Sequence, residues 1–208
     1  MNKMIKALIL TVVITVSLGI TGMAQDFPTV NYTVKSGDSL WKICEKYQVG
    51  VSEVITANPQ IANSDIINVN KIVIVPDLTS VKTVEKQVAK MVNNERAKAG
   101  LSPLKLNWQL SRVARYKSQD MIDKNYFSHT SPTYGSPFVM MTNFGINYSS
   151  AGENIAYGQQ TATEVMTGWM NSSGHRANIL NSSYTEIGVG LAKSSDGTCY
   201  WTQQFIGQ

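Results

Sequence analysis

The chain has 208 residues, which leaves room for one or two domains, and its 43% apolar and 15% charged content is typical of a folded protein. This composition excludes a wholly disordered chain and a coiled coil. The net charge of +4 includes Lys3 and Lys6, which we expect to be removed. Without them, 16 basic residues stand against 14 acidic ones, a net charge of +2. The basic residues are scattered, so we expect no nucleic acid partner.

The first 24 residues have the pattern of a secretory signal peptide. Lys3 and Lys6 precede an apolar run over residues 7–20, and Gly22 and Ala24 are the small residues that signal peptidase requires before a cut. The run is also too short to span a hydrocarbon core of ~30 Å. We therefore expect cleavage after Ala24, export of the chain, and no stable membrane anchor after cleavage.

The two cysteines, Cys44 and Cys199, fall in different predicted domains. A small exported domain that depended on disulfides would carry several pairs, so we predict that both are buried as small apolar residues. A nucleophilic cysteine paired with a histidine is the alternative.

Residues 31–77 predict a small module in the order strand, helix, helix, strand. Alternation favours a strand from Tyr32, and Asp38 stands in a turn where it can cap the helix that follows. Apolar residues at helical spacing continue through Trp41, which we assign to the core. A second short helix ends at Asn58, and a closing strand follows.

The module resembles a LysM domain in its motifs YTVKSGDSLWKI (32–43), ANP (57–59) and IVIVP (72–76). The family binds N-acetylglucosamine-containing glycans such as peptidoglycan and chitin. It does so in a shallow groove between two loops, which turn residues and an apolar ledge would line. The resemblance implies eight glycan-binding residues: Gly37, Asp38, Ser39, Leu40, Asn58, Pro59, Gln60 and Ile61. The alternative for the turn residues among them is a purely structural role.

A short polar linker is predicted at residues 78–82, followed by a larger α+β domain at 83–208. Helical periodicity recurs in four stretches: 84–92, 110–121, 137–144 and 161–170. Two strands follow at 187–192 and 200–206, joined by an Asp-Gly turn that favours a hairpin. This order predicts helices that cover an antiparallel sheet. The sequence has no G-x-S-x-G, P-loop or H-E-x-x-H motif, so serine hydrolase, nucleotide-binding and zincin functions lose their usual support.

The only two histidines, His129 and His175, lie in Gly/Ser-rich stretches on either side of Glu153. Two imidazoles and a carboxylate from three segments are the ligands of an open, three-ligand metal site, or the members of an acid/base pair. Their spacing carries no local geometry, so hydrogen-bonded loop histidines are the alternative.

The larger domain resembles a CAP domain of the bacterial, SCP-like form, the superfamily of cysteine-rich secretory, antigen-five and pathogenesis-related proteins. The motifs that carry the resemblance are NNERAKAGLSPL (93–104), FSH (127–129), GENIA (152–156), WMNSSGHRANIL (169–180), IGVG (187–190) and WTQQF (201–205). The resemblance implies an α-β-α sandwich with a central cleft. The whole chain is thus expected to join a small βααβ module to this larger sandwich.

Animal and plant members of the family place two histidines and two glutamates in the cleft, and some bind zinc there. By this resemblance His129 matches the first histidine and Glu153 the first glutamate. The second glutamate would fall on Ser172 and the second histidine near Tyr200, so neither is present. Bacterial members carry a Gly-His-Arg stretch instead, and we expect its His175 to replace the missing imidazole. The resemblance therefore implies catalytic or metal-binding roles for His129, Glu153 and His175, with zinc or another divalent metal as cofactor. Asn154, next to a site residue, is expected to brace a loop.

These features predict a secreted protein of the cell wall or spore surface that binds peptidoglycan through its LysM module. We expect its cleft to have a non-catalytic binding or assembly role, with a protein or a small apolar ligand as partner. The alternative is a metal-dependent hydrolase that acts on the cell wall or on exported peptides through that cleft. A purely structural coat or matrix protein is the third hypothesis.

Overall fold

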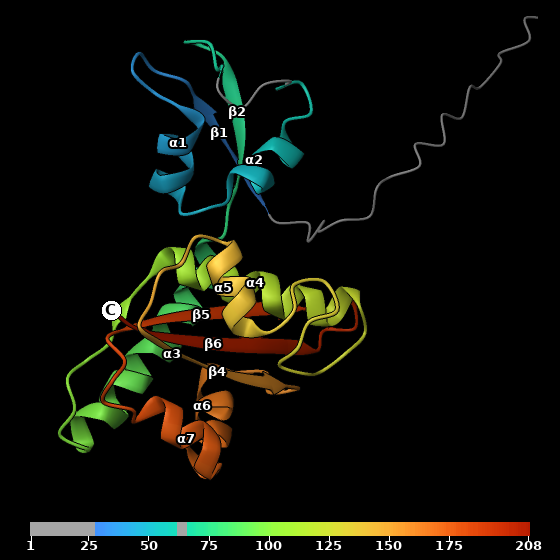
Figure 1. The fold of residues 1–208 in the computed structure, drawn as a ribbon. Coiled ribbons are helices and arrows are strands. Elements are labelled where there is room, and N and C mark those ends of the chain that lie inside the picture. The colour runs from blue at the N-terminus through green and yellow to red at the C-terminus, as the bar shows by residue number, and fades with distance from the viewer. Residues whose placement is uncertain (1–27, 62–65) are drawn as a thin grey trace, which may run out of the picture.

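The computed structural model describes residues 28–61 and 66–208, and it contains a small N-terminal unit and a larger C-terminal unit (Figure 1). The predicted signal peptide, residues 1–24, lies outside the described residues. Within the described ranges, no helix combines the length and the apolar character that a membrane span requires.

The small unit has the predicted order of elements. They are β1 (Thr29–Thr33), α1 (Leu40–Tyr47), α2 (Val51–Ala57) and β2 (Ile72–Pro76). The two strands pair antiparallel, and both helices pack on them around a core that includes Ile43 and Val54. Ser39, and not Asp38 as predicted, caps α1: its Oγ accepts from the Lys42 amide at 3.2 Å.

Asp38 instead fixes the turn before α1. Its Oδ2 accepts from the Tyr32 hydroxyl and from the Lys35 amide, each at 2.8 Å. The prediction for Trp41 is wrong, because this side chain is 49% exposed and its ring lies 6.4 Å from that of Trp108 in the larger unit. Helical spacing places Trp41 on a face of α1 that the larger unit approaches, and a pattern within one module cannot show that.

The larger unit is the expected α-β-α sandwich. Its elements are α3 (Thr79–Lys98), β3 (Lys105–Leu106), α4 (Trp108–Asp123), α5 (Pro137–Asn143), β4 (Ser150–Tyr157), α6 (Ala162–Asn171), α7 (Ser173–Ile179), β5 (Glu186–Lys193) and β6 (Cys199–Gly207). The strands form one sheet in the order β3-β5-β6-β4. Figure 1 shows α4 and α5 on one face of this sheet and α6 and α7 on the other, with α3 packed against α6.

Alternation along the strands supplies two cores. Ile187, Trp201 and Phe205 point to the side of α3 and α6, whereas Ile206 points to the side of α4 and α5. Helix α4 lies close on β5 because Gly188 and Gly190 face it: a Cβ at either position would overlap the backbone of α4. The two glycines of the IGVG motif therefore allow α4 to pack directly against β5.

Three features differ from the sequence prediction. Helix α3 begins at Thr79, inside the predicted linker 78–82, so the helix follows β2 almost directly. Strands β3 and β4 and helix α7 were not among the predicted elements. The sequence of β4, SAGENIAY, lacks alternation, and the strand forms because it pairs with β6 over its whole length. Cys44 and Cys199 are free and buried, which confirms that prediction.

Candidate functional site

Glu153 lies on β4, the edge strand of the sheet, and forms the centre of the site. Its Oε1 is 2.9 Å from Nδ1 of His129, and its Oε2 accepts from Nε2 of Gln204 at 3.1 Å. The Glu153 side chain is 1% exposed and that of His129 is 52% exposed. A buried carboxylate thus holds an imidazole that faces solvent.

A buried lysine holds the loop that carries His129. Lys117, on α4, donates to the carbonyls of Ser128 and His129 at 2.7 and 2.9 Å and to the hydroxyl of Tyr126 at 2.9 Å. Burial lowers the pKa of Lys117, and the charges of Glu153 and Asp120 oppose that shift. The ammonium group of Lys117 therefore fixes the position of the backbone at His129.

Asp120, one turn further along α4, anchors the same loop on its other side. Its Oδ2 accepts from the hydroxyls of Tyr126 and Ser131, and its Oδ1 accepts from the hydroxyl of Thr133, each at 2.6 Å. The loop is therefore fastened to one helix at several points, so the position of His129 is set by α4.

His175 approaches from the opposite face of the sheet. It lies in α7, partly buried, and its carbonyl accepts from Nδ2 of Asn154 at 3.1 Å. Asn154 also bonds to Asn178 and Gln203, which confirms its expected bracing role. Burial and, to a smaller extent, the charge of His129 lower the pKa of His175.

The structure thus brings His129 and Glu153 into contact, whereas His175 is linked to them only through Asn154, the residue that follows Glu153. In the part of the chain that the structure describes, no group of three or more His, Cys, Asp or Glu side chains is placed to hold a metal ion. The two oxygens of Glu153 are already engaged by His129 and Gln204. The three side chains do not fit the predicted three-ligand metal site in this arrangement, and we derive no step through a metal.

Two exposed aromatic rings lie on the two segments that carry the pair, and the sequence did not point to them as site residues. Phe127 and Tyr157 are each 51% exposed, with ring centroids 5.9 Å apart, and Tyr200 packs against Tyr157 at 4.9 Å. We call these three residues the aromatic ledge. Tyr157 follows Glu153 by four residues on the same face of β4, so strand alternation would have pointed to it.

The eight predicted glycan-binding residues divide into two groups. Gly37, Pro59 and Gln60 are exposed, and Asp38, Ser39 and Ile61 are partly exposed. Leu40 and Asn58 are buried, contrary to a place on the groove surface. Asn58 donates to the carbonyls of Val54 and Ile74 at 2.6 Å and accepts from the Ile74 amide at 2.8 Å. Its side chain is used to join α2 to β2.

The His129–Glu153 pair can handle a proton. A carboxylate is an acceptor, so in the neutral imidazole Nδ1 carries the hydrogen toward Glu153 and Nε2 is left as an acceptor. A base whose second nitrogen is held by a carboxylate is the arrangement that general base catalysis uses, and it also suits a polar ligand with one donor.

Family models match the chain in two places. The model of the cysteine-rich secretory protein family, CAP, matches residues 89–205, and that of the LysM domain matches residues 32–76. The chain belongs to the CAP family and carries a LysM domain before its CAP domain.

Two of its relatives are proteins of Bacillus species that match the CAP part of the chain. The chain is 59% identical over 130 residues to the uncharacterized protein YkwD of Bacillus subtilis, covering 62% of this chain and 49% of YkwD. It is 34% identical to an extracellular SCP-domain protein of Bacillus anthracis, with a TM-score of 0.57, over 67% of this chain and 47% of that one. The chain therefore spans about half the length of these relatives. Over 42 residues, 19% of this chain and 25% of the relative, it is also 45% identical to the secreted LysM effector Blys4 of Beauveria bassiana.

Proposed function

We propose that this protein is secreted, is held at the bacterial cell wall or spore surface by its LysM domain, and presents the CAP cleft as a binding site. The observation that carries the proposal is the LysM domain, in which exposed turn residues such as Gly37 and Gln60 lie next to hydrogen-bonded turns and strands. Backbone groups and an apolar residue such as Ile61 are suited to an uncharged acetamido sugar. Peptidoglycan is the glycan that we assign.

For the cleft we propose a non-catalytic role in binding or assembly. The aromatic ledge supports it, because two half-exposed rings, on the same segments as a polar pair, offer a protein or a small apolar ligand area for contact, and the pair offers a directional hydrogen bond.

A hydrolase that acts on the wall or on exported peptides is the second candidate. The His129–Glu153 hydrogen bond favours it, since it orients Nε2 of His129 to accept a proton from a water molecule. A metal-dependent version of this candidate requires His175 to approach the pair, because no group of three ligands is in place among residues 28–61 and 66–208.

One incubation tests both candidates. Wild type and a His129→Ala/Glu153→Ala/His175→Ala variant are mixed with purified sacculi, with zinc or with a chelator, and the pellet and the released fragments are analysed. We expect both proteins to pellet and neither to release fragments. Fragments from wild type alone would make the cleft a hydrolytic site, and their loss with chelator would make it metal-dependent. Failure of both proteins to pellet would contradict the proposed binding of peptidoglycan by the LysM domain.

A further inference from the structure

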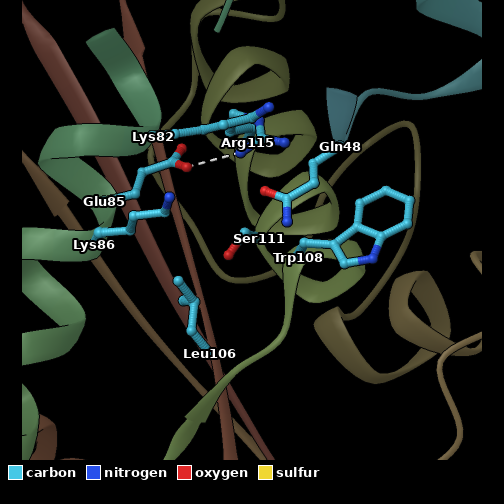
Figure 2. Close-up of a pocket in the computed structure, with 8 residues that line it drawn as sticks. All are labelled: Gln48, Lys82, Glu85, Lys86, Leu106, Trp108, Ser111 and Arg115. Carbon is cyan, nitrogen blue, oxygen red and sulfur yellow. Dashed lines mark hydrogen bonds and ion pairs between the residues drawn. The ribbon is translucent and has the colours of Figure 1, made fainter. Parts of the chain in front are cut away.

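The LysM and CAP domains meet at a junction that contains polar contacts beside the Trp41–Trp108 ring contact. Ser52 and Tyr116 join their hydroxyls at 3.1 Å, and Nζ of Lys82 donates to the carbonyl of Tyr47. Beside these contacts a pocket opens between the end of α1 and the helices α3 and α4 (Figure 2). Gln48 comes from the LysM domain, and the other lining residues come from the CAP domain.

The pocket carries an excess of positive charge. Lys82, Lys86 and Arg115 line it together with a single carboxylate, that of Glu85. Glu85 Oε2 accepts from Nη1 of Arg115 at 2.7 Å, and both side chains are more than nine-tenths buried. Burial and the charge of Arg115 lower the pKa of Lys82 to about 8. The pocket therefore has three positively charged side chains and one negatively charged side chain, so a further negative group would be attracted to it.

Arg115 also has an unused hydrogen-bonding edge. Its Nε and Nη2 are buried and have no hydrogen-bond partner among residues 28–61 and 66–208. These two nitrogens point their N–H bonds in parallel along one side of the guanidinium, which is the fork that binds two oxygens of one carboxylate. A buried donor without a partner is destabilising, so an acceptor that entered here would relieve that cost.

We propose that this junction pocket binds one carboxylate group of a cell wall component through the Nε and Nη2 edge of Arg115. Lys82 and Lys86 supply the charge, and Trp108 forms a wall against which the adjoining carbon atoms pack. The space is about 20 Å³, far below the roughly 300–1,000 Å³ of sites that enclose a whole small molecule. The occupant is therefore one end group of a larger molecule.

The assignment to the wall rests on the proposed function, whereas the carboxylate chemistry does not. Peptidoglycan offers a carboxylate from two sources, the lactyl group of muramic acid and the end of a stem peptide. The probes are therefore N-acetylmuramic acid and N-acetyl-D-alanine, each compared with its methyl ester, and binding to the full chain is measured by calorimetry. We expect at least one acid to bind about tenfold more tightly than its ester, since a charged fork is lost with the ester.

Variants locate the effect. Lys86→Gln removes an exposed cation of the pocket, and Lys90→Gln removes an exposed cation one turn further along α3 that does not line it. The acid should lose about three- to tenfold in affinity with the first and nothing with the second. Arg115→Lys keeps a charge beside Glu85 and should abolish the preference for acid over ester.

Three results would overturn the inference: equal binding of acid and ester, equal effects of Lys86→Gln and Lys90→Gln, or competition by inorganic phosphate as strong as by the acids. Binding of an N-acetylglucosamine oligomer is measured on the same protein. If the oligomer alone fails to bind, the proposed function is contradicted. If the acids alone show no preference over their esters, this inference is contradicted.

Discussion

The imidazole of His129 and the carboxylate of Glu153 meet at 2.9 Å, although a loop carries one and an edge strand the other. The contact is half exposed on the histidine side, so solvent weakens it. The Glu153 side chain is nevertheless only 1% exposed, so an acceptor there that loses its donor is not rehydrated. The pair therefore couples a surface loop to the sheet.

This coupling can be measured with a double-mutant cycle of His129→Ala and Glu153→Gln. We expect each single variant to lower the free energy of unfolding by about 1 kcal/mol, and the two effects to differ from additivity by about 0.5–1 kcal/mol. Chemical denaturation provides the measurement. A second cycle that pairs Glu153→Gln with Lys90→Gln, on an exposed face of α3, should be additive, and equal behaviour of the two cycles would refute a specific bond.

Lys117 is the residue on which the His129 loop depends, and Lys117→Met tests this. The apolar side chain fills the buried site but leaves the carbonyls of Ser128 and His129 without their donor. We expect a loss of about 1–3 kcal/mol in stability, together with faster amide exchange in residues 126–131. Unchanged exchange in this loop, with α4 intact, would mean that Asp120 alone holds it.

The sequence predicted the LysM module and most helices of the CAP domain because their information is local. Caps such as Thr161, the apolar spacing of α4 and α6, and the Asp-Gly turn of the last hairpin act within a few residues. Strand β4 was missed since its stability comes from β6, about 50 residues away, and a single-strand pattern does not contain that pairing.

The site was predicted in the same uneven way. His129 and Glu153 were chosen by residue type and by family resemblance, and the structure brings them together. Their supports, Gln204 and Lys117, were not chosen, because a glutamine in a strand and a lysine in a helix carry no signal until the fold buries them. The junction pocket was beyond sequence reasoning, since two domains form it.

Within the LysM domain, Asn58→Ala should lower the stability of the fold, whereas Gln60→Ala should weaken glycan binding without changing stability. Asn58 is fully buried and holds α2 to β2, so its loss should destabilise the domain by about 2–4 kcal/mol. Gln60 is exposed, and its removal should leave the melting temperature unchanged while weakening sedimentation with sacculi. Thr56→Ala, on the exposed face of α2, is the control for both assays, and weaker sedimentation by this variant would discredit the groove.

Lys82 should make stability depend on pH in a defined direction. Its pKa is about 8 in the folded protein and near 10.5 in an unfolded chain, so the folded state loses the proton first. The charge that burial penalises disappears as pH rises above about 8, and stability should rise between about pH 8 and 9.5 relative to Lys82→Met. The groups that act on Lys82 are Arg115, Glu85, Glu53 and Lys86. A parallel pH profile for wild type and variant would contradict the prediction.

The last prediction concerns the close packing of α4 against β5. This packing matters for the site because α4 positions both the His129 loop and Arg115. In Gly190→Ala the new Cβ would overlap the backbone of Ala114 and Arg115, which no side-chain rotation relieves. Helix α4 must move, and we expect a loss of about 3 kcal/mol or more. In Gly168→Ala, on the exposed face of α6, the Cβ meets open space and the better helix propensity of alanine should add about 0.5–1 kcal/mol. Thermal denaturation of the two variants separates a general effect of alanine from an effect of the packing of α4 against β5. If both changed stability by the same amount and sign, the IGVG motif would have to be kept for a reason other than the approach of α4.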